Sequence, residues 1–207
     1  MTSRVTGWPG VLKRKKKQSD LNLENNPMRY VIVDLEATCW EKGTSPDRQE
    51  IIEIGAVSLD SSVGRASEEF ACFVRPIIRP FLSAFCVQLT GVRQEDVDQA
   101  EFFPVAFERF LTWIGPKPFI LCSWGLYDLK QFRVDCTRHN IAFPKTFERH
   151  TNLKKEFARL KGVRKMGMAA ALRHLKLPLV GQHHRGIDDA RNIAKIAQII
   201  LPEINGQ

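Results

Sequence analysis

The chain has 207 residues, 43% of them hydrophobic, and a formal net charge of +8, which suits one globular domain with a sizeable core. It has no apolar run long enough to cross a membrane and no signal-peptide core at its N-terminus, so we expect neither a membrane protein nor a secreted one. The five cysteines form no C-x-x-C pair. They indicate buried free thiols in a reducing compartment, the cytoplasm, rather than disulfides or a zinc site.

The positive charge is concentrated in two segments. Residues 1–17 hold six Lys or Arg and no acid, and residues 145–176 hold ten against two acids, whereas the remainder is acidic. This distribution is typical of a protein that holds a polyanion beside an acidic, metal-binding centre, although solvated helix faces would have the same composition. We expect polyanion binding to rest largely on 145–176. Residues 1–28 are predicted to be a disordered basic tail before a single domain over 29–207.

The first half of the predicted domain consists mainly of strands. Residues 29–36 contain an unbroken β-branched run, which predicts a strand buried on both faces. Residues 50–57 and 69–75 predict two further strands, and short connections make the three an antiparallel meander. Thr90-Gly91 marks a turn after it.

In the second half, helices alternate with a short strand. Apolar residues share one helical face over 103–114, and residues 119–122 predict a buried strand. Further helices are predicted over 126–139, from a cap at Asn152 to 160, over 168–175 and over 188–201. A meander followed by alternating strands and helices indicates an α/β domain with a mixed central sheet.

Two carboxylates, Asp34 and Glu36, stand at the end of the first predicted strand. Side chains two apart on a strand point to the same face, and burying like charges together is costly unless they are paired or protonated. A divalent cation removes this cost, because carboxylates are natural ligands of Mg²⁺ and Mn²⁺. A strand end that simply reaches solvent is the alternative, and the more common one for an isolated pair.

A third carboxylate, Asp128, lies just past the strand at 119–122, in the first turn of the next helix. The end of a central strand is where α/β folds build their sites. A helix start also favours an aspartate for its own sake, so Asp128 alone does not indicate a site.

The last cluster contains two overlapping pairs of a histidine and an aspartate, His183 with Asp188 and His184 with Asp189. At about 100° per residue, the apolar stripe of the final helix is centred near Ala190. Asp189 then lies beside the buried face, whereas Asp188 points to solvent and can cap the helix. We therefore choose Asp189, and with it His184.

These residues make a set of four carboxylates with one histidine: Asp34, Glu36, Asp128, Asp189 and His184. Four carboxylates can hold two divalent ions about 3.5–4 Å apart, as in two-metal phosphodiesterases, where the attacking and the leaving oxygen are both stabilised. A histidine that titrates at about pH 6.5 can take the proton of the attacking water. The residues alone thus favour metal-dependent cleavage of a phosphodiester.

The pattern resembles the DEDDh 3′→5′ exonucleases of the RNase H-like superfamily. Residues 34–38 are similar to the first motif of this family, and residues 123–130 to the second. Residues 184–189 are similar to the third, which has a small residue two positions after the histidine. Gly186 meets that condition, whereas the alternative pairing with His183 does not. Pattern and helix geometry therefore agree.

Within the family, residues 34–41 and 82–92 are similar to the signatures of the Eri-type exoribonucleases and their KapD-like and prion-interactor-like relatives. The resemblance covers about residues 29–201. It implies an RNase H-like α/β fold with a mixed five-stranded sheet, three antiparallel strands followed by parallel strands, flanked by helices.

The resemblance also implies the roles of individual residues. Two Mg²⁺ or Mn²⁺ ions would be held by Asp34, Glu36, Asp128 and Asp189, and His184 would be the general base. Nucleoside 5′-monophosphates would be released from a nucleic acid with a free 3′ end, with RNA favoured over DNA. Contacts to the terminal nucleotide would come from Ala37, Thr38, Leu89, Thr90 and Tyr127.

Two other functions stay open at this point. Relatives in the wider family cut DNA, so the chain could be a 3′→5′ exodeoxyribonuclease. It could also be a non-catalytic module that holds nucleic acid or a protein partner on the same fold. The presence of all five candidate residues argues against a decayed site.

Overall fold

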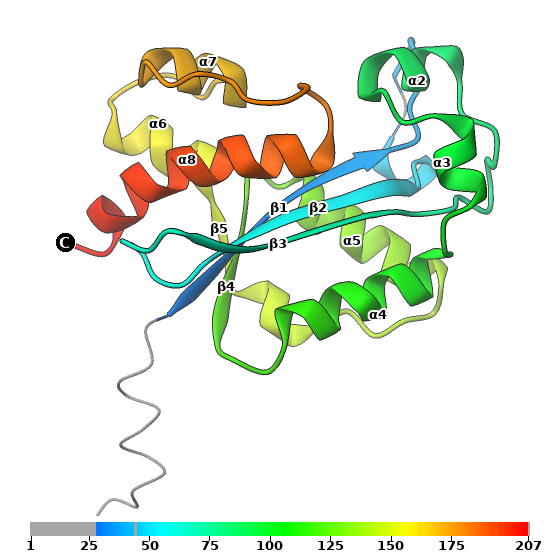
Figure 1. Cartoon of the computed structure of the whole chain (residues 1–207), viewed down its shortest axis with the longest axis horizontal. Helices are drawn as coiled ribbons and strands as arrows, with labels where there is room; N and C mark the ends of the chain where they lie inside the picture. The colour runs from blue at the N-terminus through cyan, green and yellow to red at the C-terminus, as the bar shows by residue number, and fades with distance from the viewer. Residues whose placement is uncertain (1–27, 44, 207) are drawn as a thin grey trace, which may run out of the picture.

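The computed structural model describes residues 28–43 and 45–206, which form a central sheet with helices on both faces (Figure 1). Most of the predicted basic tail, residues 1–27, lies outside the described residues. Five strands make up the sheet, in the order β3-β2-β1-β4-β5.

The strands match the predicted fold class. β1 (Arg29–Ala37), β2 (Ile51–Leu59) and β3 (Ala66–Phe73) form the antiparallel meander. β4 (Phe119–Ser123) pairs parallel with β1, and β5 (His150–Asn152) pairs parallel with β4. The predicted mixed sheet, three antiparallel strands and then parallel strands, is confirmed.

Helices cover the two faces of the sheet as separate layers (Figure 1). On one face α6 (Leu153–Leu160), α7 (Met168–His174) and α8 (Gly186–Ile204) pack on β1 and β2 through one apolar cluster. On the other face a cluster rich in phenylalanine joins the sheet to α4 (Phe103–Ile114) and α5 (Tyr127–Arg138). These five helices were predicted within about two residues at each end, except for the C-terminal end of α8.

The alternation of β1 decides which way its acids point. Val33 and Leu35 belong to the cluster shared with α4 and α5, whereas Ile32 belongs to the cluster shared with α8. Because side chains alternate along a strand, Asp34 and Glu36 lie on the same face as Ile32. The acids of β1 therefore face the start of α8.

Helix α8 begins earlier than predicted, at Gly186 rather than at 188, and Arg185 is its N-cap residue. The predicted capping role of Asp188 is wrong. Its carboxylate instead accepts a hydrogen bond from the backbone N–H of Gln182 and pairs with Arg191, one turn along the helix.

A close backbone contact explains why α8 can begin so near the sheet. A Cβ added to Gly55 on β2 would lie 2.1 Å from the carbonyl carbon of Gly186. Such a separation is impossible for real atoms, so only glycine fits at Gly55. The first turn of α8 thus rests directly on the backbone of β2.

Two short helices, α2 (Ala84–Thr90) and α3 (Gln94–Asp98), lie where the sequence indicated only a turn. Ser83 caps α2 by accepting from the N–H of Cys86, and Gly91 ends it with a φ of 68°. The 3-10 turns η1 (Pro46–Arg48) and η2 (Lys145–Glu148) complete the elements.

No helix among the described residues is long and apolar enough to cross a bilayer. All five cysteines lie in the described part and are free, with Cys86, Cys122 and Cys136 buried. Location in the cytoplasm stays a prediction.

Candidate active site

All four predicted carboxylates line one cleft of about 380 Å³ at the C-terminal ends of β1 and β4. β1 supplies Asp34 and Glu36, the start of α5 supplies Asp128, and the first turns of α8 supply Asp189. The cleft therefore gathers residues 155 positions apart in the sequence, from Asp34 to Asp189.

Three of the acids lie close enough to share a cation. One oxygen from each of Asp34, Glu36 and Asp189 lies within 4.8 Å of the other two. Glu36 is 8% exposed and Asp189 4% exposed. Asp34 is half-buried, so hydration offsets little of the repulsion between Glu36 and Asp189 and only part of that with Asp34.

The fourth acid, Asp128, is bonded to the backbone of β1 between Asp34 and Glu36. Its Oδ1 accepts a hydrogen bond of 3.1 Å from the backbone N–H of Leu35, the residue between Asp34 and Glu36. This contact joins the first turn of α5 to the end of β1.

Burial and mutual repulsion make the acids hard to ionise. The pKa of Glu36 is raised from 4.5 to about 9, first by burial and then by the charges of Glu53, Asp189 and Asp128. Burial and the neighbouring acids also raise the pKa of Asp34 well above its ordinary value. Burial raises the pKa of Asp128 to about 6, against the hydrogen bond from Leu35.

Such a cluster fits a divalent cation. Carboxylate oxygens are the hard ligands that Mg²⁺ and Mn²⁺ prefer, and a bound cation would remove the repulsion that raises these pKa values. The residues present therefore suit the predicted metal centre.

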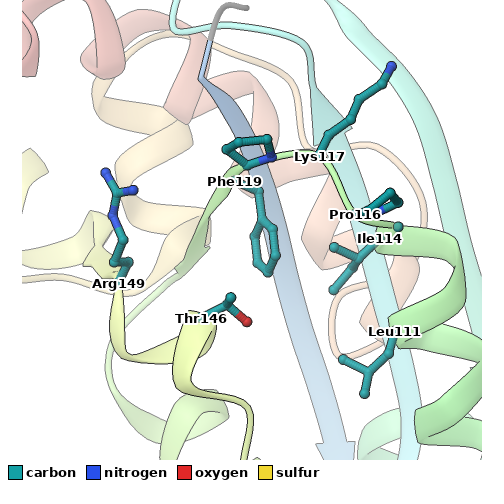
Figure 2. A pocket seen from close by; sticks show the side chains of 9 residues that line it. Leu111, Ile114, Pro116, Lys117, Phe119, Thr146 and Arg149 are labelled. Carbon is teal, nitrogen blue, oxygen red and sulfur yellow. The ribbon is translucent and has the colours of Figure 1, made fainter. Parts of the chain in front are cut away.

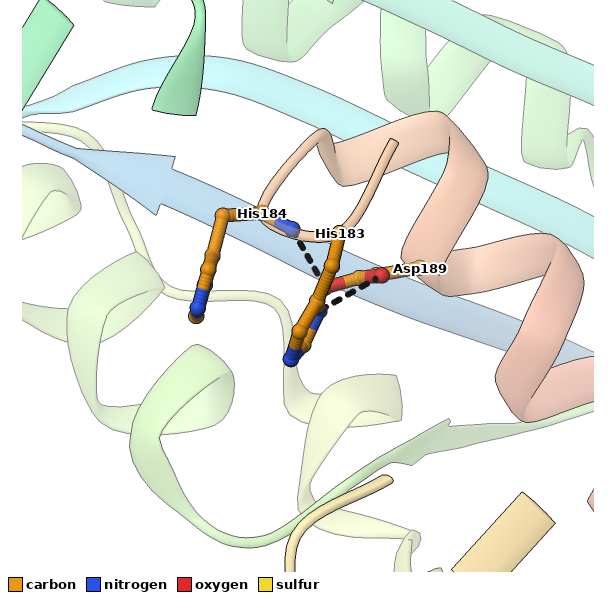
Figure 3. Close-up of side chains that lie close together, drawn as sticks. All are labelled: His183, His184 and Asp189. Atoms are coloured by element: carbon orange, nitrogen blue, oxygen red, sulfur yellow. Dashed lines mark hydrogen bonds and ion pairs between the residues drawn. The ribbon is translucent and has the colours of Figure 1, made fainter. Parts of the chain in front are cut away.

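Both histidines of the last motif reach the cleft, and their rings stack with centroids 4.0 Å apart (Figure 3). The Nδ1 atom of His183 lies 2.8 and 3.1 Å from the two carboxylate oxygens of Asp189. His184 contacts the same carboxylate through its backbone N–H, at 3.0 Å. In this structure His183, rather than His184, has its ring bonded to Asp189.

His184 has a backbone conformation that non-glycine residues rarely adopt, with a φ of 66°. The pKa of its half-buried ring is lowered by burial and by His183, against the opposite effect of Asp189. The imidazole is therefore neutral at pH 7 and able to accept a proton.

The structure brings three of the five predicted nucleotide contacts into the cleft: Ala37, Leu89 and Tyr127. Thr38 and Thr90 are not among its lining residues and are 2% and 0% exposed. The hydroxyl of Thr38 accepts from the N–H of Glu50, and that of Thr90 donates to the carbonyl of Cys86. Their side chains thus stabilise the protein rather than face the cleft.

Two residues beside the site, Glu53 and Arg185, were not predicted, and neither lines the cleft. Glu53 lies on β2 directly opposite Glu36, is 1% exposed and pairs with Arg185. The sequence could have indicated Glu53, because it is the one charged residue inside the otherwise apolar strand β2. Arg185 had no such signal, because a basic residue in a loop is ordinary.

A second hollow, of about 410 Å³, lies near the start of β4, at the opposite end of the sheet from the acids (Figure 2). Its walls are apolar, including Leu111, Ile114 and Phe119, with Lys117 and Arg149 at the edge. Among residues 28–43 and 45–206, no acid or histidine lines it. The acidic cleft therefore differs from this hollow in the side chains that line it rather than in its volume.

A family model described as Exonuclease (RNase_T) matches residues 31–197. The Danio rerio protein named ERI1 exoribonuclease 2 is 32% identical over 98% of this chain, which spans only 41% of that relative. The Drosophila melanogaster protein named 3'-5' exonuclease Snipper is 32% identical, over 89% of this chain and 73% of its own length.

Among solved structures, the nuclease domain of 3'hExo, described as a DEDDh family member bound to rAMP, has the same fold. It superposes with a TM-score of 0.81 at 30% identity, and the match covers 86% of this chain and 94% of that one.

Proposed function

The chain belongs to the RNase_T exonuclease family, and from this premise we propose that it is a metal-dependent 3′→5′ exoribonuclease. We assign the activity to residues 29–207. The observation that carries the proposal is the convergence of Asp34, Glu36 and Asp189 within 4.8 Å in a cleft that Asp128 also lines. The relative named an exoribonuclease and the neighbour bound to rAMP support RNA over DNA as substrate.

In this proposal two Mg²⁺ or Mn²⁺ ions would be held by Asp34, Glu36, Asp128 and Asp189. Ions bound there supply Lewis-acid stabilisation of the charge that develops on the phosphodiester. The protein's part is to bring the four carboxylates to one place, where bound cations would favour their charged forms. Leu35 contributes by donating its N–H to Asp128 at 3.1 Å, which favours the charged carboxylate.

His184 is proposed as the general base. Its ring is neutral at pH 7 because its pKa is lowered, and it lines the cleft beside the acids. It would take the proton of the attacking water, and the products would be nucleoside 5′-monophosphates. The family spacing supports His184 over His183, although the ring of His183 is the one that contacts Asp189 here.

The terminal nucleotide would lie against Ala37, Leu89 and Tyr127. Tyr127 is 37% exposed, and its hydroxyl donates to the side-chain carbonyl of Gln49, so its ring is presented at the mouth of the cleft. Aromatic rings at such a place can stack on a base of either nucleic acid.

The proposal is tested with 5′-labelled oligonucleotides of matched RNA and DNA sequence, single- and double-stranded, with Mg²⁺ or Mn²⁺. We expect stepwise shortening from a free 3′ hydroxyl, release of 5′-monophosphates, and no activity in EDTA. Asp189→Asn should abolish cleavage, whereas Asp188→Asn, a matched loss of a neighbouring acid outside the cluster, should retain it.

Each outcome separates the candidate functions. Faster shortening of DNA than of RNA would identify an exodeoxyribonuclease instead. Binding of either nucleic acid without release of nucleotides in both metals would indicate a non-catalytic module.

A further inference from the structure

Glu53 has an unusual set of partners for a carboxylate so near a proposed metal centre. Its Oε2 accepts from the Nε of Arg185 at 3.1 Å and from the backbone N–H of Gly186 at 3.1 Å. Its Oε1 accepts from a terminal guanidinium nitrogen of Arg185 at 3.4 Å. Both oxygens are thus already bonded to a guanidinium and a backbone N–H, and Glu53 does not line the cleft.

The guanidinium of Arg185 is held from two sides. It pairs with Glu53 on β2 and lies over the ring of Phe73 on β3, 5.3 Å from the centroid. Its side chain is only 25% exposed. A cation fixed by both an ion pair and an aromatic face has few other positions.

The two residues of the last motif that are proposed for the site lie on either side of Arg185 in the sequence. His184 precedes it, and Asp189 lies in the first turns of the helix that follows. Gly186 packs against β1 and β2, because a Cβ there would be 3.0 Å from the carbonyl oxygen of Asp34 and 3.2 Å from the N of Gly55. The turn between residues 182 and 186 is therefore fastened to the sheet at its last two residues.

We propose that Glu53 and Arg185 are positioning residues, which fix His184 and Asp189 against Asp34 and Glu36. This inference rests on the proposed nuclease activity, since it concerns the same site. Glu53 acts through Arg185 and Gly186 and does not touch the substrate. Arg185 could alternatively bind a substrate phosphate directly, and the two roles predict different kinetics.

The test compares Glu53→Gln, Arg185→Gln and the double variant at saturating Mn²⁺ on a single-stranded RNA. Glu69→Gln is the matched control, because Glu69 also pairs with a cation of α8, Arg191, but at the edge strand β3. All are assayed at a temperature where circular dichroism shows each variant folded. Arg185→Lys serves as the conservative variant.

Each single variant of the pair should lower kcat about tenfold to a hundredfold, the effect of a displacement of roughly 1 Å at a reacting group. KM should stay within about threefold of the wild type, since uniform substrate binding is not removed. The double variant should be no worse than the poorer single one, because both substitutions break the same ion pair. Arg185→Lys should recover part of kcat, and Glu69→Gln should match the wild type.

A raised KM with unchanged kcat for Arg185→Gln would overturn the proposal in favour of direct phosphate binding. The proposal would also be overturned if the loss of kcat in the double variant equalled the product of the two single losses, because the two residues would then act independently. If Glu53→Gln does not fold, the Arg185 variants decide the question, because that side chain reaches the surface.

Amide hydrogen exchange separates failure of this inference from failure of the proposed function. In Arg185→Gln, exchange at His184 and Gly186 should be faster than in the wild type, with residues 193–200 of α8 unchanged. A wild type that releases no nucleotide would refute the proposed function while leaving this measurement valid. Unchanged exchange at His184 and Gly186 would refute the positioning role.

Discussion

Glu36 is the side chain whose ionisation reports most directly on the cluster. Its pKa is about 9 in the folded chain and that of Asp128 about 6, against ordinary values of 4.5 and 3.8. Because the folded state keeps protons that the unfolded state has lost, stability is highest below the ordinary values and is lost as the pH rises through the folded ones.

We therefore expect the metal-free protein in EDTA to have a melting temperature that falls from pH 5 to pH 9. Mg²⁺ should remove most of that fall, because a ligand that binds only the folded state stabilises it. Glu36→Gln should raise the melting temperature in EDTA at pH 8, while Asp188→Asn should leave the slope unchanged. A melting temperature in EDTA independent of pH would contradict the clustering of these charges.

The two histidines can be told apart by their rates. His184→Ala should lower kcat by about 10²–10⁴-fold, the usual contribution of a general base. His183→Ala should have a smaller effect, because the family spacing assigns the base to His184, and the ring of His183 contacts the carboxylate of Asp189 instead. His174→Ala on α7, an exposed histidine outside the cleft, is the control. A larger loss from His183→Ala than from His184→Ala would reverse the assignment.

At the residue scale the sequence identified every acid among the described residues that lines the cleft, because the four together fitted the motifs of a known family. Taken alone, Asp34, Glu36 and Asp128 each had an ordinary explanation. The sequence did not identify Glu53. A buried glutamate can be satisfied by partners anywhere in the chain, and Arg185 lies 132 residues away. Thr38 and Thr90 were expected at the nucleotide, but motif similarity does not say which way a side chain points.

β2 and the start of α8 contact each other directly through the backbones of Gly55 and Gly186. Gly55→Ala would place a Cβ 2.1 Å from the carbonyl carbon of Gly186, so α8 must move away from the sheet. We expect a loss of about 1–3 kcal/mol or more in the free energy of unfolding, as for other overpacked sites, and loss of nuclease activity.

Gly167→Ala is the control for that prediction. A Cβ at Gly167 would meet nothing within 4 Å, and its φ of −65° suits any residue. Urea unfolding of both variants measures the difference. Equal stability of Gly55→Ala and the wild type would mean that the helix start adapts without cost.

The elements that the sequence predicted well have either regularly spaced apolar residues, as in α4, or a continuous apolar run, as in β4. The helix at 103–114 matches α4 at both ends, and the strand at 119–122 is one residue shorter than β4. β5 has only three residues, all half-buried, so neither length nor alternation reveals it. α2 and α3 are also short, and their stability comes from caps and tertiary packing, which apolar periodicity does not register.

Across the whole molecule, the acidic cleft lies beside part of the basic segment 145–176. Within that segment Arg159 pairs with Glu156 and Lys161 with Glu203. Arg164 and Lys165 are exposed on the loop between α6 and α7, two residues before Gly167, which lines the cleft. Trp124, another lining residue, donates to the carbonyl of Met166 and so ties this loop to the cleft.

We therefore expect Arg164→Gln with Lys165→Gln to weaken single-stranded RNA binding and to flatten its dependence on salt. The slope of log K against log salt should fall by about 0.7 for each phosphate that the variant no longer neutralises. The control neutralises Arg65, in the turn between β2 and β3, and Arg109, on α4. Binding in a catalytically silent Asp189→Asn background measures the effect. Identical slopes in both double variants would show that the loop does not contact the backbone of the nucleic acid.

The docking of α8 has a consequence for how the proposed site could be lost. Asp34, Glu36 and Asp128 lie on β1 and at the start of α5, whereas His183, His184 and Asp189 lie on the turn and the helix that rest on Gly55. Local unfolding of the first turn of α8 would therefore separate one proposed ligand and the proposed base from the other three carboxylates while the sheet stays folded. The site would be restored when the helix docks again.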